Sequence, residues 1–200
     1  MKEIYGIVQG KDEQPLEKAM VALLNDKFEM EFSTETDKNG KFDLPAESKC
    51  YPFFIAVKEY KENYLEYWCQ NIDLQKDLEI NPKIDKLEIY GLHCFRIKGA
   101  SNYLMIYFRP MSLTKFQAKE KDIAPGMTKE SLTVSVNGEF CEILVMTHVD
   151  EQGGEEIGSM TSYLVQVSTD GVKFREKNRL EISITDAEGD YGEASLFFKV

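Results

Sequence analysis

The chain has 200 residues, of which 42% are hydrophobic and 30% are charged, a composition that excludes wholesale disorder and allows a sizeable core. Lys and Arg number 24 against 35 for Asp and Glu, and this net charge of -11 disfavours nucleic acid and anionic membrane surfaces as partners. No apolar run approaches the roughly 18 residues that a membrane span needs, so we expect no membrane insertion.

Short β-type runs follow one another along the first half of the chain, separated by turn residues at roughly every 8–12 positions. We expect strands at residues 4–8, 19–24, 28–32, 42–44, 53–57 and 72–80. Asp37, Asn39 and Gly40 predict a tight hairpin, because Asn and Gly tolerate positive φ and Asp accepts backbone N–H bonds. Pro45 is expected to end its strand, and the two-sided apolar run 53–57 is expected to lie centrally in a sheet.

Residues 81–86 contain Pro82 among polar side chains and predict a domain boundary, with one domain at residues 1–83 and a second at 84–200. In the second half we expect strands at residues 87–97, 103–108, 132–136, 140–149, 163–167, 180–184 and 194–200. Pro110 is expected to close the second of these, Asn137-Gly138 to form a hairpin turn, and residues 115–127 and 150–159 to be loops, the former with a helical turn. Sustained helical periodicity is missing. The fold class predicted is all-β, with two tandem β-sandwich domains.

The four cysteines, Cys50, Cys69, Cys94 and Cys141, lack metal-binding spacing and are expected to be free thiols. A Cys50–Cys69 bridge is the alternative in an exported protein. The N-terminal residues show no apolar leader segment, so we expect a cytoplasmic protein, or an extracellular one if a signal peptide has been removed.

The ordered set Ile4-Tyr5-Gly6-Ile7-Val8, Pro15-Leu16 and Thr36-Asp37-x-Asn39-Gly40-x-Phe42-x-Leu44 resembles the carboxypeptidase regulatory-like domain over roughly residues 3–80. The resemblance implies a transthyretin-like sandwich of about seven strands, a fold without chemistry of its own. In peptidases this module sits beside a catalytic domain, and no His-x-x-Glu pair with a later His to bind zinc follows here. The second half is similar to bacterial immunoglobulin-like domains, and residues 186–193 resemble their last hairpin.

Catalysis would require a base beside a nucleophile or an acid, and the only histidines are His93 and His148. His93 precedes Cys94, but adjacent strand residues face opposite sides of a sheet. We therefore expect structural or surface histidines, no catalytic residues and no enzymatic activity.

Asp186, Glu188 and Asp190 alternate within one predicted turn and could converge on calcium, a hard cation that prefers oxygen ligands. The alternative, which we favour, is a hairpin turn with solvated acids. No other cofactor is expected.

The most aromatic stretch holds Tyr60, Tyr64, Tyr67 and Trp68 with Glu62 and Glu66 between them. Exposed rings of this kind stack on sugars, whereas the alternative is packing at an interface between the domains. Tyr67 and Trp68 are adjacent, so we expect one to face inward and the other to be exposed.

Two functions are compatible with these features. The first is a non-catalytic interaction or scaffolding protein whose tandem sandwiches present loops and edge strands to a protein partner. The alternative is a carbohydrate-binding module, assisted by calcium. We favour the first, because the chain shows a complete β architecture without a catalytic constellation.

Overall fold

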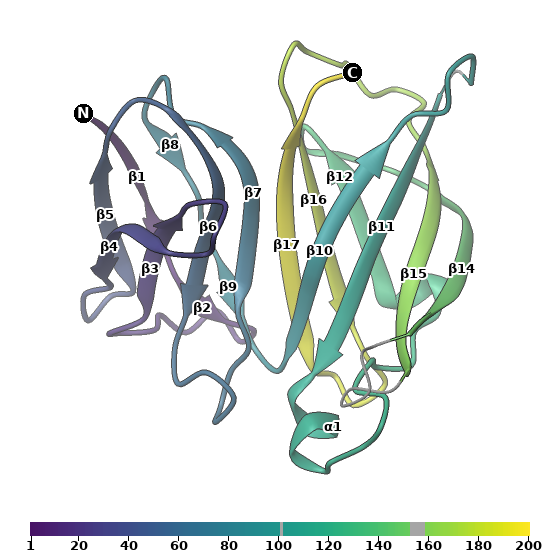
Figure 1. Ribbon diagram of the computed structural model, residues 1–200, viewed down its shortest axis with the longest axis horizontal. Helices are drawn as coiled ribbons and strands as arrows, with labels where there is room; N and C mark the ends of the chain where they lie inside the picture. Colours follow the sequence, from purple (N-terminus) through teal and green to yellow (C-terminus); the bar gives the residue numbers. More distant parts are fainter. Residues whose placement is uncertain (101, 153–158) are drawn as a thin grey trace.

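The computed structural model describes residues 1–100, 102–152 and 159–200, and strands dominate it (Figure 1). The strands of the first part are β1 Lys2–Ile7, β2 Gln9–Gly10, β3 Met20–Leu24, β4 Met30–Glu35, β5 Lys41–Ala46, β6 Cys50–Val57, β7 Tyr67–Asp73, β8 Leu78–Glu79 and β9 Lys83–Ile84. The second part contains β10 Leu87–Phe95, β11 Tyr103–Ser112, α1 Leu113–Gln117, a short 3₁₀ helix Lys129–Ser131, β12 Leu132–Val136, β13 Glu139–Phe140, β14 Ile143–Gln152, β15 Ser159–Ser168, β16 Asn178–Thr185 and β17 Tyr191–Phe198. The predicted all-β fold is confirmed.

The first sandwich packs the three-stranded sheet β5-β1-β8 against the strands β7-β6-β3-β4. Its core follows from alternation along each strand, which turns Phe42 and Leu44 of β5 inward and leaves Asp43 between them exposed. Ile4 from β1 and Phe54 from β6 meet these side chains in one buried cluster. Each fully buried side chain of this size stabilises the fold by roughly 1.5–3 kcal/mol.

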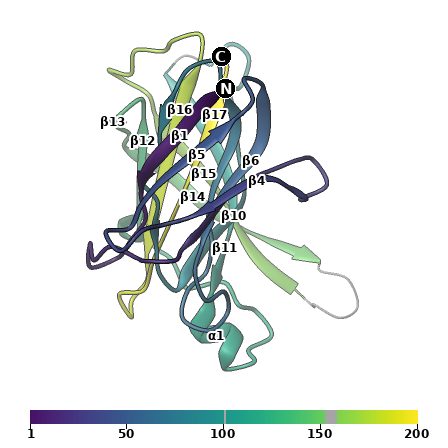
Figure 2. The ribbon, with the colours of Figure 1, turned by 90° about the vertical axis from the view of Figure 1, so that its left-hand side faces the viewer.

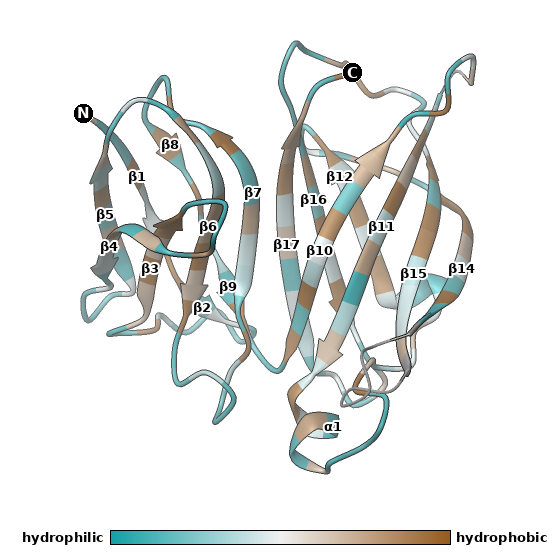
Figure 3. Cartoon of the chain, viewed as in Figure 1, coloured by the Kyte–Doolittle hydropathy of each residue, from teal (hydrophilic) through white to brown (hydrophobic). Residues whose placement is uncertain are grey.

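The second sandwich packs the sheet β10-β11-β15-β14 against the strands β13-β12-β16-β17. The alternating residues Leu132, Val134 and Val136 point into its core, where they meet Ile106 and Val165 from the other sheet. Figure 3 shows hydrophobic residues along the strands of both sandwiches and hydrophilic residues in most connecting loops. Asn137 and Gly138 both adopt positive φ, so the predicted two-residue hairpin between β12 and β13 is confirmed.

The two sandwiches share a sheet. β7 of the first pairs in parallel with β17 of the second, placing Trp68 beside Ala194 and Cys69 beside Ser195. We call this strand pair the seam. It joins both halves into one eight-stranded sheet, β13-β12-β16-β17-β7-β6-β3-β4, with the sandwiches side by side (Figure 1).

The sandwiches lie on opposite faces of this shared sheet. Tyr67 and Cys69 of β7 point into the first core, whereas Ala194 of β17 points into the second core. Ala194 is paired with Trp68, which faces away from the first core. The sheet β5-β1-β8 therefore covers one face of one half, and β10-β11-β15-β14 covers the other face of the other half.

The segment expected to be a boundary is fixed in the structure. β9 within it pairs with β2 of the first sandwich. The Lys11 ammonium lies 3.2 Å from a carboxylate oxygen of Asp85, which belongs to the segment, and 3.7 Å from a carboxylate oxygen of Asp190. The ammonium of Lys86, also in the segment, lies 3.4 Å from the same Asp190 oxygen. These ion pairs connect the first sandwich, the segment and the β16–β17 turn. The domain division between residues 83 and 84 stays a prediction.

Two prolines that were expected to end strands lie inside them. Pro45 belongs to β5, which has a sheet neighbour on one side only, so its missing N–H costs no ladder bond on the open side. Pro110 belongs to β11 opposite Ile89, beyond Phe108, where the pairing with β15 ends. The prediction that they end strands was wrong because both sit where the ladder has a vacant side.

The prediction of one strand at residues 72–80 was also wrong. β7 ends at Asp73, and the chain then crosses to the opposite sheet, where β8 pairs in parallel with β1. Of the loop expected at residues 150–159, positions 150–152 and 159 belong to β14 and β15, and residues 153–158 lie outside the described part. Figure 2 shows the light-green ends of these two strands leading away from the body of the protein.

All four cysteines are free thiols. Cys50 is exposed at the start of β6, while Cys69 is buried in the first core, so the alternative of a bridge between them is not seen. Among the helices of residues 1–100, 102–152 and 159–200, none has the length and apolar character to cross a membrane.

Candidate functional site

The staggered arrangement of the two sandwiches leaves a recess at the seam on each face of the shared sheet. On the face that carries the first core, the recess lies over β12, β16 and β17. On the opposite face, it lies between the outer side of the first sandwich and β10. Of the strands that the structure describes, only β7 contributes to both recesses, through its alternate residues Tyr67 and Trp68, and the other strands that line them differ, so the recesses differ in chemistry.

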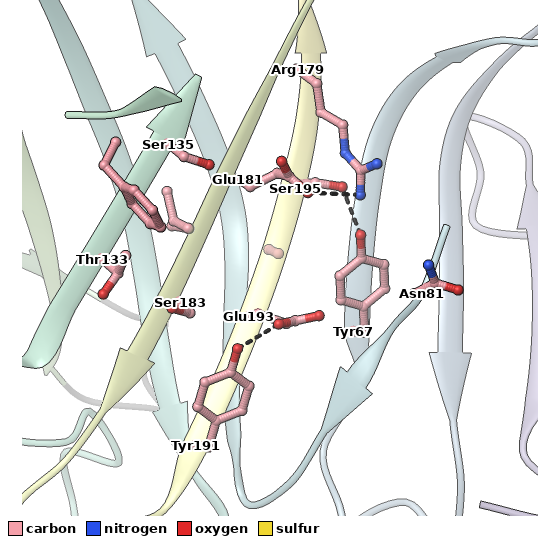
Figure 4. A pocket seen from close by; sticks show the side chains of 13 residues that line it. Tyr67, Asn81, Thr133, Ser135, Arg179, Glu181, Ser183, Tyr191, Glu193 and Ser195 are labelled. Atoms are coloured by element: carbon pink, nitrogen blue, oxygen red, sulfur yellow. Dashed lines mark hydrogen bonds and ion pairs between the residues drawn. The ribbon is translucent and has the colours of Figure 1, made fainter. Parts of the chain in front are cut away.

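The first recess contains a polar pocket of about 270 Å³, which we call the seam pocket (Figure 4). Alternate residues of β12, β16 and β17 point away from the second core. Their hydroxyl and charged side chains form the floor of the seam pocket. They include Thr133, Ser183 and Ser195 together with Glu181 and Glu193.

A hydrogen bond crosses the seam at the side of this pocket. The hydroxyls of Tyr67 and Ser195 lie 2.7 Å apart, and both side chains are buried (Figure 4). Arg179 lies beside them and pairs with Glu181 at 3.0 Å. Burial holds the pKa of Tyr67 well above its usual range, so the tyrosine remains neutral. Burial likewise raises the pKa of the neighbouring Cys69 thiol to about 11, which disfavours its thiolate form near neutral pH.

Glu193 is the most enclosed carboxylate of the seam pocket. Burial raises its pKa, although it accepts hydrogen bonds from the Tyr191 hydroxyl and, at 2.9 Å, from the Lys83 backbone N–H. The second of these bonds ties β17 to β9 of the first sandwich. Glu193 is therefore a structural link between the two halves.

A larger recess of about 590 Å³ adjoins the seam pocket and shares Arg179 and Glu181 with it; we call it the seam cleft. Its charged side chains are Lys76, Arg175, Lys177, Arg179, Asp73 and Glu181, and its apolar walls are Leu78 and Phe197. Asp73 of the first sandwich pairs with Lys177 of the second. The cleft thus combines four basic and two acidic groups, an excess of positive charge on an acidic protein.

The recess on the opposite face contains an aromatic pocket of about 180 Å³, lined by Phe28, Phe53, Trp68, Gln70, Tyr90 and Gly91. The Trp68 indole N–H donates to a carboxylate oxygen of Glu88 on β10 at 2.9 Å. Glu88 is only 1% exposed. This bond connects the sandwiches on the face opposite to the Tyr67–Ser195 bond.

Glu88 is the most strongly perturbed carboxylate of the junction. Burial, and then the nearby charge of Glu66, raise its pKa to about 7, against an ordinary value of 4.5. Burial also raises the pKa of Glu66. With Glu193, the junction therefore contains three carboxyl groups that take up protons more readily than exposed ones.

The four aromatic residues expected to bind a ligand lie in different places. Tyr67 is 3% exposed in the first core, and Tyr64 packs against that core. Trp68 is 8% exposed and lines the aromatic pocket, whereas Tyr60 is 39% exposed in the loop before β7. The expectation that either Tyr67 or Trp68 is exposed was wrong, because β7 is covered on both faces.

The three acidic residues considered for calcium lie in the β16–β17 turn. Asp186 accepts backbone N–H bonds from Glu188 at 3.1 Å and Asp190 at 2.9 Å, and Asp190 is buried beside Lys11 and Lys86. Over the described ranges, no group of three or more His, Cys, Asp or Glu side chains could hold a metal ion. The geometry is that of a hydrogen-bonded turn.

The two histidines lie apart and are exposed. His93 is on β10 opposite Tyr107, and His148 is on β14 opposite Tyr163. Cys94, which follows His93, has a pKa raised by burial to about 12. Neither histidine is placed to activate a thiol.

The seam cleft and most of the aromatic pocket were missed from sequence. Arg179 and Glu88 occupy the polar positions of regularly alternating strands, so nothing in the sequence distinguishes them from solvent-facing charges. Phe28 follows the turn residues Asn25 and Asp26, an unusual position for a bulky ring. Nothing local marks the pairing that brings Tyr90 near Trp68.

No family model matches the chain, and a search of curated proteins finds no match. Among solved structures, the chain is similar to the major pilin subunit BcpA of Bacillus cereus, with 15% identity and a TM-score of 0.32 over 98% of this chain and 67% of that one. It is also similar to a DUF3823 family protein from Bacteroides ovatus, with 8% identity and a TM-score of 0.31 over 98% and 97% of the two chains. A third is the full-length major pilin SpaD from Corynebacterium diphtheriae, with 9% identity and a TM-score of 0.28 over 98% and 64%. Similarity at this level identifies neither a family nor a function.

Proposed function

We propose that the chain is a non-catalytic interaction protein that holds a protein partner along the seam cleft. The observation that carries this proposal is the position of the cleft, which spans strands of both sandwiches where they share one sheet. A continuous hydrogen-bonded sheet fixes the two walls relative to each other. A fixed concave surface binds a partner without an entropic cost of closing it.

The chemistry of the cleft supports a protein partner. Its walls offer the apolar side chains Leu78 and Phe197 next to Arg175 and Arg179. Arginine and aromatic residues are enriched at the centres of protein interfaces and among the residues that carry most of the binding energy.

The charge of the cleft indicates the kind of segment it would take. Asp73 pairs with Lys177 and Glu181 pairs with Arg179, so the excess positive charge belongs to Lys76 and Arg175 at the rim. An acidic segment of a partner would be attracted there, whereas the rest of this acidic chain would repel it.

In this proposal residues 1–83 form a carboxypeptidase regulatory-like, transthyretin-like domain and residues 84–200 an immunoglobulin-like domain. The Asp37–Gly40 turn supports the first assignment, since its predicted turn bonds form. It links β4 of the shared sheet to β5 of the three-stranded sheet, so the prediction of a tight hairpin between paired strands was wrong. Gly40 has φ +71, and a side chain there would lie 2.5 Å from the Val8 carbonyl oxygen, so the position requires glycine. The cellular compartment stays a prediction.

The test is affinity capture from an extract of the source cells, followed by binding measurements with the purified partner. The variant K76E/R175E reverses the charge at the rim of the cleft. The variant K38E/K121E makes the same charge change at two exposed lysines away from the cleft and serves as the matched control.

We expect the wild type and the control to bind the partner equally, and the cleft variant to lose at least tenfold in affinity, about 1.4 kcal/mol. Binding should also weaken as salt is raised. Equal binding by all three proteins, or turnover of a substrate by the purified chain, would contradict the proposal.

A further inference from the structure

The aromatic pocket is built from four rings on four separate segments. Phe28 lies in the β3–β4 turn, Phe53 on β6, Trp68 on β7 and Tyr90 on β10. Phe28 and Phe53 stack with ring centroids 4.8 Å apart, and Trp68 stands at 87° to both. Tyr90 in turn stands at 84° to Trp68, with centroids 5.7 Å apart. Rings at right angles enclose a recess from several sides, unlike the flat platform on which a sugar ring stacks.

The backbone of Phe28 is strained in order to place its ring there. Phe28 has φ +61, a left-handed conformation that costs a bulky residue roughly 1–2 kcal/mol and that Gly or Asn adopts more easily. Its ring is nevertheless 50% exposed, so burial does not account for the choice of residue. Strain of this kind clusters at ligand sites.

The electrostatics of the pocket favour a cation. None of its six lining residues is charged, and ring faces are electron-rich. Behind Trp68 the indole N–H donates to Glu88, which makes the ring face more negative. The Tyr90 ring already contacts one cation of the chain, since the Arg109 guanidinium lies 5.9 Å from its centroid.

We propose that the aromatic pocket binds a small quaternary ammonium ion, which the faces of Phe28, Trp68 and Tyr90 hold by cation–π attraction. The volume of about 180 Å³ suits a compact group rather than an extended chain. The pocket lies on the opposite face of the shared sheet from the seam cleft. This proposal is therefore independent of the protein partner.

Trp68 is the only tryptophan of the chain, so its fluorescence reports directly on the pocket. The probe is choline, titrated into the full-length protein at constant ionic strength. The control ligand is 3,3-dimethyl-1-butanol, which has the same shape without the charge, and methyl glucoside tests a sugar. We expect choline to change the Trp68 fluorescence in a saturable way, and the neutral analogue to bind roughly tenfold more weakly.

Variants of Phe28 separate ring electrostatics from apolar bulk. Phe28→Tyr should retain choline affinity, whereas Phe28→Leu and Phe28→Ala should weaken it several-fold. The matched control is Phe140→Ala, at a ring that is 79% exposed and does not line this pocket. Because Phe28 lies in an exposed turn, these variants are expected to fold, and far-UV circular dichroism checks this.

Three results would overturn the proposal. Equal affinity for choline and its neutral analogue would show that the pocket is merely apolar. Binding of methyl glucoside without choline would identify a sugar site. Absence of choline binding in both fluorescence and calorimetry would show that the pocket takes no such ion.

Discussion

The two faces of the shared sheet at the seam both use residues of β7 but are built from different chemistry. On one face Tyr67 reaches Ser195 through a hydroxyl bond, beside an arginine and carboxylates. On the other, Trp68 packs among aromatic rings and donates to the buried Glu88. Since adjacent strand residues alternate between faces, β7 alone contacts the second sandwich twice, through Tyr67 to β17 on one face and through Trp68 to β10 on the other.

The comparison teaches which face holds the junction together. Apolar burial scales with area, whereas a hydrogen bond between neutral groups contributes only about 1 kcal/mol net. We therefore expect the aromatic face to dominate stability and the polar face to contribute specificity of register. The following predictions test this ranking.

The largest effect is expected from Trp68→Ala, which should lower the free energy of unfolding by roughly 3–5 kcal/mol. The change removes the ring at the centre of the aromatic pocket and leaves Glu88 without its indole donor. Urea unfolding followed by circular dichroism measures it. Trp68→Phe, which keeps a ring, should cost less; a loss below about 1 kcal/mol for the alanine variant would invert the ranking.

The next effect is a pH dependence that belongs to the aromatic face. The folded-state pKa of Glu88 is raised to about 7 from 4.5, so its protonated form is favoured in the fold. The contribution of neutral Glu88 to the free energy of unfolding is therefore fully present below pH 4.5 and is lost as pH rises through 7. The change is about 3 kcal/mol. The groups facing it are Glu66, which opposes ionisation, and Lys61 and the Trp68 indole, which favour it.

Glu88→Gln stays neutral at every pH and should therefore be more stable than the wild type at pH 8, with the difference shrinking towards pH 4. Urea midpoints at a series of pH values measure the slope. Glu188→Gln, at an exposed carboxylate, is the control and should follow the wild type. Parallel curves for the wild type and Glu88→Gln would show that Glu88 ionises normally.

A smaller effect is expected on the polar face. Tyr67→Phe removes the bond to Ser195 and leaves that buried hydroxyl without its partner, at a cost of about 1–2 kcal/mol. In a double-mutant cycle, adding Ser195→Ala should recover part of this loss. A coupling of zero would mean that the two hydroxyls do not bond in solution.

The smallest effect is expected at the acidic turn near the end of the seam. Because Asp190 is held by Lys11 and Lys86 and Asp186 accepts backbone N–H bonds, we expect calcium to leave the melting temperature of EDTA-treated protein unchanged. Differential scanning calorimetry measures this. A rise with calcium that Asp190→Asn abolishes would instead establish the site.

Local patterns in the sequence predicted much of the fold. The apolar run at residues 53–57 lies in the central strand β6. Alternation at Leu132, Val134 and Val136 correctly predicted β12, which turns these three residues into the second core. These predictions succeeded because strand periodicity and turn chemistry are properties of neighbouring residues. The prolines failed for the complementary reason: whether a strand has a vacant side depends on the sheet around it.

The functional surfaces were less predictable, because both depend on the seam. Trp68 and Ser195 are separated by most of the chain, and no residue near either one encodes their proximity. The aromatic stretch drew attention to Trp68, but its neighbours Phe28 and Tyr90 come from other segments. Composition shows the net negative charge of the chain, but it gave no sign of the local excess of cations in the seam cleft.

The parallel pairing of β7 with β17 also sets the order of events during synthesis. β7 ends at Asp73 and its partner β17 begins only at Tyr191, so the edge of β7 that faces β17 has unpaired N–H and C=O groups until β17 has been synthesised. At roughly 5–20 residues per second this interval lasts on the order of 10 s. During this interval the open edge of β7 can pair with a strand of another nascent chain on a neighbouring ribosome. Slower elongation over the second half would lengthen the interval.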